Sequence, residues 1–277
     1  MKKGVLSSRR AAKRRVAVFL ALALFLAAVS LAAPYLVPND PYQTNSDRMN
    51  APPDARCPFG TDHLGRCVFS RVLMGARTSI FSALALVAVS FAVGTLLGML
   101  CGWYGGVLDE LVMRLADILL AFPQMVLAIA VAGILGGSLF NAMLAMGITG
   151  WTLYARLARS AVLQLRQEPF VAAARLSGCR TGAILFRHLL PNILGPLVVN
   201  AVTQIGSMMI GIAGLSFLGI GVTPPAAEWG SMISEAQGGM QLAPWAVLAP
   251  GGAMVVTVMI FNELGDSVRD LLDVSGQ

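Results

Sequence analysis

The sequence has little charge. Only 12% of its 277 residues are Asp, Glu, Lys or Arg, whereas 56% are hydrophobic and the mean hydropathy is +0.72. In soluble globular domains about 25% of residues are charged. The composition therefore excludes a soluble fold and indicates an all-α protein that crosses the membrane several times.

Cysteine and histidine are also scarce, with four and two residues. No CxxC pair occurs, which excludes zinc-ribbon and thioredoxin-type motifs. The sequence GxxxxGK[ST], whose backbone cradles nucleotide phosphates, is absent as well. We therefore expect that this chain is not an enzyme, holds no metal ion and binds no cofactor.

Intramembrane acids and internal repeats are missing too. A secondary transporter or channel is the competing class, and it would need inverted repeats or carboxylates within the spans for ion coupling. No carboxylate lies deep in an apolar run of this chain. The sequence disfavours that class.

Six apolar runs are long enough to cross the ~30 Å hydrocarbon core of a bilayer. The third and fourth come from one run, which Gly136, Gly137 and Ser138 divide. The first could instead be a signal peptide, although it is longer than the usual apolar region of one. We expect spans at about 16–33, 78–108, 118–135, 139–157, 192–215 and 245–261.

Basic residues orient these spans. A cluster precedes the first span and places the N-terminus in the cytoplasm. Six spans then leave residues 34–77 and 216–244 outside and the C-terminus inside. The segment 156–191, which holds six arginines and the single acid Glu168, lies inside in agreement with the positive-inside rule. The N-terminal cluster consists of Lys2, Lys3, Arg9, Arg10, Lys13, Arg14 and Arg15.

The inside segment predicts a short helix and a sharp turn. Residues from Arg166 to Ser177 favour a helix, and Gly178 is placed to end it in the left-handed conformation. The alanines 172–174 leave part of that helix without bulk, so another surface can approach its backbone. On these residues alone the segment is either a docking element or an ordinary loop with arginines at the lipid phosphates.

A second helical stretch is expected at 182–190. It ends at Pro191, which the first turn of the following span tolerates.

The spacing in this segment resembles the loop of binding-protein-dependent importers of the ATP-binding-cassette class. That loop reads Glu-Ala-Ala, three residues, Gly, nine residues, Ile, one residue, Leu-Pro. Ala172 replaces the Glu and His188 the Ile of that pattern, as in the peptide and nickel branch. The resemblance implies an ATPase-coupling loop that includes Ala172, Ala173, Ala174, Arg175, Gly178, His188, Leu190 and Pro191.

Three further stretches resemble the C-type permease of nickel, dipeptide and oligopeptide importers. FGTDHLGRCVFSRVLMGAR, at 59–77, is similar to the signature FGTDxxGRDxxSRxxxGxR. LSFLGIGVTPPAAEWGSMI, at 215–233, and FNELGDSVRDLLD, at 261–273, resemble the outside loop and the C-terminal end of that family. Four motifs in the right order identify the chain as a member of the family.

The resemblance implies a type I importer permease with six transmembrane helices and cytoplasmic termini in the cell membrane. Residues 1–77 are then the basic N-terminus, the first span and an extracytoplasmic loop. Residues 78–277 form the core permease domain, with the cytoplasmic coupling loop at 160–191. The implied partners are a homologous B-type permease, two ATPase subunits that bind ATP and Mg²⁺, and an extracytoplasmic solute-binding protein. Arginines of the loop are expected to pair with acids on the ATPase.

Other residues are weaker candidates. Asn141, Asn200 and Gln204 lie at or inside spans, where they line the translocation path or form interhelical hydrogen bonds. Glu228 and Trp229, in the outside loop, are candidate contacts for the binding protein.

Cys57 and Cys67 lie outside the membrane in the expected topology. They can form a disulfide, remain free thiols, or hold a metal together with His63.

The cargo is the least determined property. AEWGSMI and RLSG are closer in wording to the nickel branch, so we expect nickel or a nickel chelate, with di- or oligopeptides as the alternative.

Overall fold

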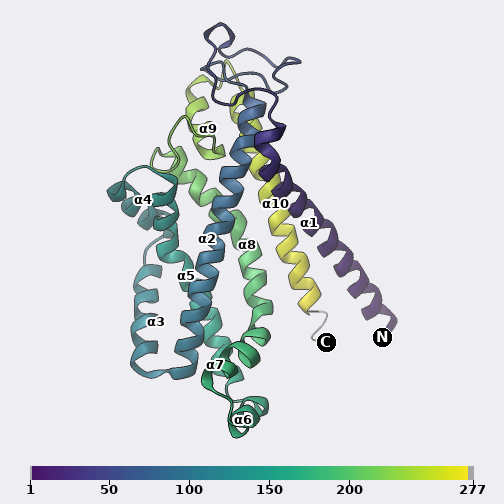
Figure 1. The fold of residues 1–277 in the computed structure, drawn as a ribbon, viewed down its shortest axis with the longest axis vertical. Helices are drawn as coiled ribbons and strands as arrows, with labels where there is room; N and C mark the ends of the chain where they lie inside the picture. Colours follow the sequence, from purple (N-terminus) through teal and green to yellow (C-terminus); the bar gives the residue numbers. More distant parts are fainter. Residues whose placement is uncertain (1, 274–277) are drawn as a thin grey trace.

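The computed structural model describes residues 2–273, which form an elongated bundle of helices (Figure 1). The only β-pairing within these residues is an isolated bridge between Thr61 and Cys67. The all-α fold expected from the composition is confirmed.

Five helices are long: α1 (Lys2–Leu36), α2 (Val68–Tyr104), α5 (Leu139–Leu165), α8 (Leu190–Phe217) and α10 (Trp245–Asp273). The shorter elements are α3 (Gly106–Leu120), α4 (Gln124–Leu135), α6 (Pro169–Leu176), α7 (Thr181–Ala183), the π-helix η2 (Ile184–Leu189), α9 (Trp229–Ala236), and the 3-10 helices η1 (Ser46–Arg48) and η3 (Gln237–Gly239).

The two ends of the bundle differ. In Figure 1 the upper end holds α9 and the loop 37–67, and the lower end holds α6 and α7. Helix α1 begins and α10 ends toward the lower end, on the same side as α6. The start of α1, the end of α10 and helix α6 therefore lie toward one side of the bundle. That this side is cytoplasmic stays a prediction.

Helix length and apolarity account for four or five membrane spans. Four helical stretches qualify alone: 11–36, 68–104, 181–217 and 245–272. Helices α3 and α4 qualify together as one broken span. A sixth span requires α5, which carries Arg156 and Arg159 and is not among them. The expected count of six stays a prediction.

The third expected span, 118–135, is wrong as a single straight helix. Helix α3 starts at Gly106, after a turn in which Gly105 and Gly106 have φ of 64° and 60°. Helix α4 follows it at an angle of 91°. The break falls before Pro123, which lacks an N–H and biases Phe122 away from helical geometry.

Two helix boundaries also differ from expectation. Helix α2 begins at Val68, so the loop after α1 is shorter than expected and the boundary placed between residues 77 and 78 lies inside this helix. Its early start was missed because the span was placed on the charge-free run, which begins only after Arg77. Helix α10 continues to Asp273, so the expected short tail is helical.

A row of glycines brings α2 and α5 into close contact. A Cβ atom at Gly94 would lie 2.2 Å from the carbonyl oxygen of Trp151, and one at Gly98 would lie 2.2 Å from that of Ala155. At Gly102 the distance to the carbonyl oxygen of Arg159 would be 2.9 Å. Small residues at this spacing let two membrane helices approach backbone to backbone. We call these three residues the glycine ladder.

From the glycine ladder toward the lower end, side chains from α2, α5, α6, η2 and α8 form one buried cluster, which we call the inner core. It consists of Met99, Tyr154, Ala158, Val162, Val171, Ala174, Ile184, Leu185, Leu189, Ile193 and Leu197. The coupling loop is thus packed onto the bundle rather than suspended from it.

The glycine ladder predicts a difference between two Gly→Ala substitutions. Gly98→Ala forces α2 away from α5 and should cost about 1–3 kcal/mol. Gly252→Ala in α10 meets no atom within 4 Å and should leave stability unchanged or raise it, because alanine favours helix more than glycine. Thermal unfolding in detergent compares the two. Equal melting temperatures of Gly98→Ala and Gly252→Ala would contradict the close packing of α2 and α5 at the glycine ladder.

Candidate functional site: the α6 loop and the outer cap

Helix α6 is the expected docking helix, and it lies at the lower extreme of the molecule (Figure 1). It starts at Pro169 rather than at Arg166, because proline suits the first helical position. At its end the N–H of Gly178 donates to the carbonyl of Arg175 (3.0 Å), and that of Cys179 donates to the carbonyl of Ala174 (3.1 Å). Gly178 has φ of 77°. This is a Schellman end, so the predicted role of Gly178 as a helix stop is confirmed.

The two faces of α6 differ in exposure. Val171 and Ala174 point into the inner core, with 0% and 8% of their surface exposed. Ala172 and Ala173 are exposed, and Leu176 is 90% exposed. Only two of the three expected alanines therefore lie on the exposed face of α6, where Leu176 projects beside them. We call Ala172, Ala173 and Leu176 the free face of α6. A face with small residues around one large apolar side chain suits insertion into a cleft of another protein.

Two arginines of the loop region form ion pairs within the chain. Arg156 pairs with Asp117, and Arg159 pairs with Asp109, where the distance from Nη2 to Oδ2 is 2.6 Å. Both partners belong to α3. These arginines, expected to meet acids on another subunit, instead tie α5 to α3.

Two more arginines hold the loop against the lower end of α2. The Nη1 of Arg166 donates to the carbonyl oxygen of Gly102 over 3.1 Å. The guanidinium carbon of Arg175 lies 4.4 Å from the centre of the Trp103 ring. A cation this close to an aromatic face is attracted by the ring quadrupole. Arg175, expected in the coupling loop, thus fastens α6 to α2.

The stretch after α6 is less regular than expected. Instead of one helix at 182–190, α7 is followed by the π-helix η2, in which the N–H of Leu190 donates to the carbonyl of Leu185. The half-buried His188 has its carbonyl bound by the Asn192 side chain (2.6 Å). Leu190 is half-buried, and Pro191 lies exposed in the first turn of α8, as expected.

The candidate path residues have local roles in this structure. The Nδ2 of Asn141 donates to the carbonyls of Leu135 (2.8 Å) and Gly136 (2.9 Å), which closes the turn between α4 and α5. The Nδ2 of Asn200 donates to the carbonyl of Pro196 (2.9 Å) inside α8. Gln204 is half-buried one turn further on. Their place in a translocation path stays a prediction.

At the opposite end, Glu228 and Trp229 hold α9 against α2. The Glu228 carboxylate accepts from the N–H of Gly230 and of Ser231 (2.9 Å each) and from the hydroxyl of Ser79 (3.0 Å). The two side chains are 1% and 2% exposed. They therefore support the outer surface and do not form it, so the expected contact with a binding protein has no exposed group here.

A buried group of four charges joins the loop 37–67 to α2 and α9. Arg66 Nε lies 2.6 Å from Asp62 Oδ2, and Arg71 Nη2 lies 3.4 Å from Glu235 Oε2. Arg66 also pairs with Glu235. Both arginines are at most 2% exposed. We call these four residues the outer charge cluster. Its charges cancel, which buried ions require.

Cys57 and Cys67 lie close together and buried, as free thiols. Burial raises the pKa of the Cys57 thiol to about 12, and a hydrogen bond with Cys67 adds to this. The alternative metal site with His63 gains no support, since no group of three or more metal-binding side chains occurs among the described residues. The disulfide remains a prediction.

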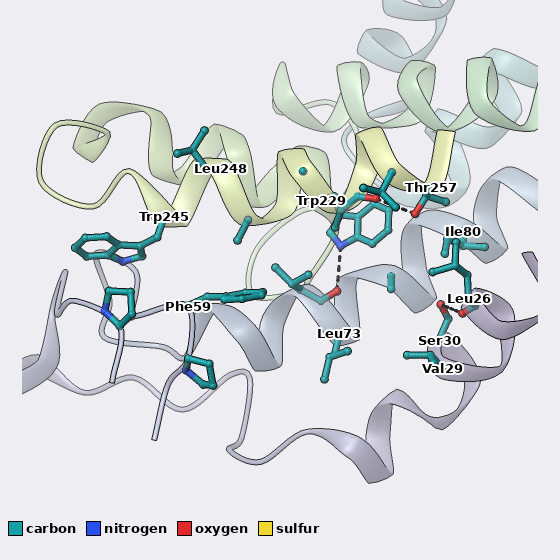
Figure 2. Close-up of a pocket in the computed structure, with 18 of the residues that line it drawn as sticks. Leu26, Val29, Ser30, Phe59, Leu73, Ile80, Trp229, Trp245, Leu248 and Thr257 are labelled. Carbon is teal, nitrogen blue, oxygen red and sulfur yellow. Dashed lines mark hydrogen bonds between the residues drawn. The ribbon is translucent and has the colours of Figure 1, made fainter. Parts of the chain in front are cut away.

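A groove of about 760 Å³ lies between α1, α2 and α10 and reaches the loop 37–67 (Figure 2). Its two hydroxyls are already bound, because Ser30 donates to the carbonyl of Leu26 (2.7 Å) and Thr257 to that of Ala253 (2.8 Å). Trp229 and Trp245 add aromatic surface. Because its wall has so few free polar groups, the groove suits lipid acyl chains or apolar side chains rather than a hydrated solute.

These features define a class. A bundle of long apolar helices, with the partly free helix α6 at one end and a structured cap at the other, is that of a protein that crosses the membrane several times.

The comparisons with known proteins agree. Residues 94–274 match the family described as binding-protein-dependent transport system inner membrane component. A dipeptide permease of Alkalihalophilus pseudofirmus is 42% identical over 88% of this chain and 81% of its own length. A glutathione permease of Pectobacterium atrosepticum is 42% identical over 96% and 89%. A nickel permease of Escherichia coli is 39% identical over 93% of each. The chain belongs to this family and matches its C-type permeases for nickel and peptides.

Three features were missed from the sequence. These are the contact of Trp103 with α6, the exposed Leu176 and the glycine ladder. The spacing of Gly94, Gly98 and Gly102 was available as a signal, because glycines four residues apart in an apolar run mark a close helix contact.

The neighbouring thiols give a testable prediction. In an oxidising compartment Cys57 and Cys67 should form a disulfide, so denatured protein from intact membranes should bind alkylating reagent at both residues only after reduction. In reduced native protein Cys57 should react slowly and faster as pH rises, because the thiolate is the reactive form and the thiol pKa is raised. Full labelling of both thiols without reductant would exclude the bridge.

Proposed function

We propose that this protein is one of two paired permease subunits of an ATP-driven importer in the cytoplasmic membrane. Its partners are a homologous B-type permease, two ATPase subunits and an extracytoplasmic solute-binding protein. ATP and Mg²⁺ bind to the ATPases, and this chain contributes half of the translocation path.

The observation that carries the proposal is the free face of α6. Ala172, Ala173 and Leu176 are exposed, while the other face of the same helix is locked into the inner core. A force applied to the free face is therefore transmitted to the bundle. Closure of the ATPases around ATP pulls α6, and the bundle moves between a state open to the inside and a state open to the outside. ATP and the loaded binding protein both shift the equilibrium between these two states.

The docking face predicts which bulky substitution stops transport. Ala173→Trp fills the surface that must approach the ATPase and should lower uptake by about 30-fold, the effect of losing a contact worth ~2 kcal/mol. Gly178→Val should do the same by straining the end of α6. Uptake by cells and co-purification of the ATPase measure this.

Val107→Trp is the matched control, because Val107 is 73% exposed at the same end of the molecule but lies outside α6. Normal uptake by Ala173→Trp, or equal loss in both variants, would reject the docking face.

For the cargo, we propose a short peptide or glutathione-like solute as the first candidate. Relatives named for dipeptides and glutathione are 40–42% identical to this chain. Nickel or a nickel chelate is the second candidate, supported by the wording of AEWGSMI and by a nickel permease at 39% identity.

Competition decides between the two cargoes. In cells that express the whole importer, unlabelled dipeptides or glutathione should abolish uptake of a labelled peptide, while nickel chloride should have no effect. In calorimetry the cognate binding protein should bind dipeptides or glutathione more tightly than nickel. Uptake of labelled nickel that peptides do not reduce would reverse the assignment.

A further inference from the structure

We infer that α2 is a strut that links the docking helix to the outer end of the molecule, and that Trp103 is the positioning residue through which α6 acts on it. The inference rests on the proposed function, because it assigns the route by which docking at α6 reaches the outer end.

The lower end of this route is the contact between α6 and Trp103. The Trp103 ring lies on the last turn of α2 and receives the Arg175 guanidinium at 4.4 Å. The neighbouring residue Gly102 accepts the hydrogen bond of Arg166 from just before α6. Arg175 is itself in the last turn of α6. A movement of α6 therefore acts on the end of α2 as well as on the inner core.

The middle of the route is stiff. Helix α2 has 37 residues, a length of about 55 Å, and contains no proline. Helices α8 and α10 contain Pro196 and Pro250, and α8 is connected to α6 through α7 and the π-helix η2. Prolines and π-turns are the usual places where helices bend. Of the two long helices without proline that leave the lower end, α2 and α5, α2 is the one bonded to α9 at its other end.

The upper end of the route is a set of bonds between α2 and α9. The indole N–H of Trp229 donates to the carbonyl of Val72 (3.0 Å), and the backbone N–H of Trp229 donates to the hydroxyl of Ser79 (3.1 Å). Arg71, on the first turn of α2, pairs with Glu235 of α9. Axial movement of α2 therefore moves α9, which lies between the outer ends of α8 and α10 (Figure 1).

Variants at Trp103 test the lower contact. In the whole importer reconstituted in liposomes, Trp103→Leu should lower both cargo uptake and the stimulation of ATP hydrolysis by the binding protein by about three- to tenfold, the range expected for one lost cation–π contact. Trp103→Phe keeps an aromatic face and should restore most of the activity.

Tyr104→Leu is the matched control, since Tyr104 is the next residue of α2 and is 62% exposed; it should behave as wild type. If Trp103→Leu fails to assemble with the ATPases, Arg175→Gln removes the same contact from the other side, with Arg175→Lys as its conservative partner. Wild-type coupling in Trp103→Leu or in an assembled Arg175→Gln complex would overturn the inference.

A double-mutant cycle tests whether the two ends belong to one route. Trp229→Phe removes the indole bond between α9 and α2. Trp245→Phe removes a bond of the same kind and length, from Trp245 to the carbonyl of Thr61 (3.0 Å), that does not involve α2. The measured quantity is the loss of ATPase stimulation by the binding protein. In the double variant with Trp229→Phe, this loss should differ from the sum of the two single losses. In the double variant with Trp245→Phe, it should equal the sum.

Additive effects in both pairs would reject the strut. The failure of the proposed function has a different signature: the wild-type complex would then show neither cargo uptake nor stimulation by the binding protein, whereas failure of the strut leaves both intact in the wild type.

Discussion

The contact on which the bundle depends is the close approach of α2 and α5. At Gly98 the two backbones are so near that a methyl group would fall 2.2 Å from the carbonyl oxygen of Ala155. Lipid tails are as apolar as leucine, so helices in a membrane gain little from hiding apolar side chains and depend on close packing instead. The glycine ladder supplies that packing, and α6 follows directly from α5. The position of α6 relative to α2 therefore depends on the three glycines of the ladder, which have no side chain to separate α2 from α5.

Charged groups act at both ends of the bundle. At the outer end the charge cluster closes the loop 37–67 over α2 and α9, with four ions that satisfy one another. At the inner end Arg159 pairs with Asp109 and Arg175 lies on Trp103. Breaking a buried pair leaves an uncompensated charge, which costs far more than an exposed pair contributes. Ion pairs and a cation–π contact thus stabilise the ends of the bundle, and the close packing of α2 and α5 at the glycine ladder stabilises its middle.

Much of the candidate site was predictable because its signals are local. The end of α6 at Gly178 follows from one residue whose φ must be positive, and Pro191 from a residue that suits a first helical turn. The bend before Pro123 was missed because the apolar run continues across it. The burial of Glu228 and Trp229 was missed for another reason: a polar and an aromatic residue in an outside loop look exposed until the helix that covers them is placed.

The sequence by itself determined that this is a helical membrane protein, that it belongs to the importer permeases, and where its docking helix ends. These properties depend on composition, motif spacing and residues next to one another in the chain. Only the tertiary structure decided which alanines of α6 are free, that Arg175 lies on Trp103 of the same chain, and that Arg71 is buried within α2 beside Glu235. Each of these depends on a contact between residues tens of positions apart or more, and such contacts exist only once α2 and α5 have packed.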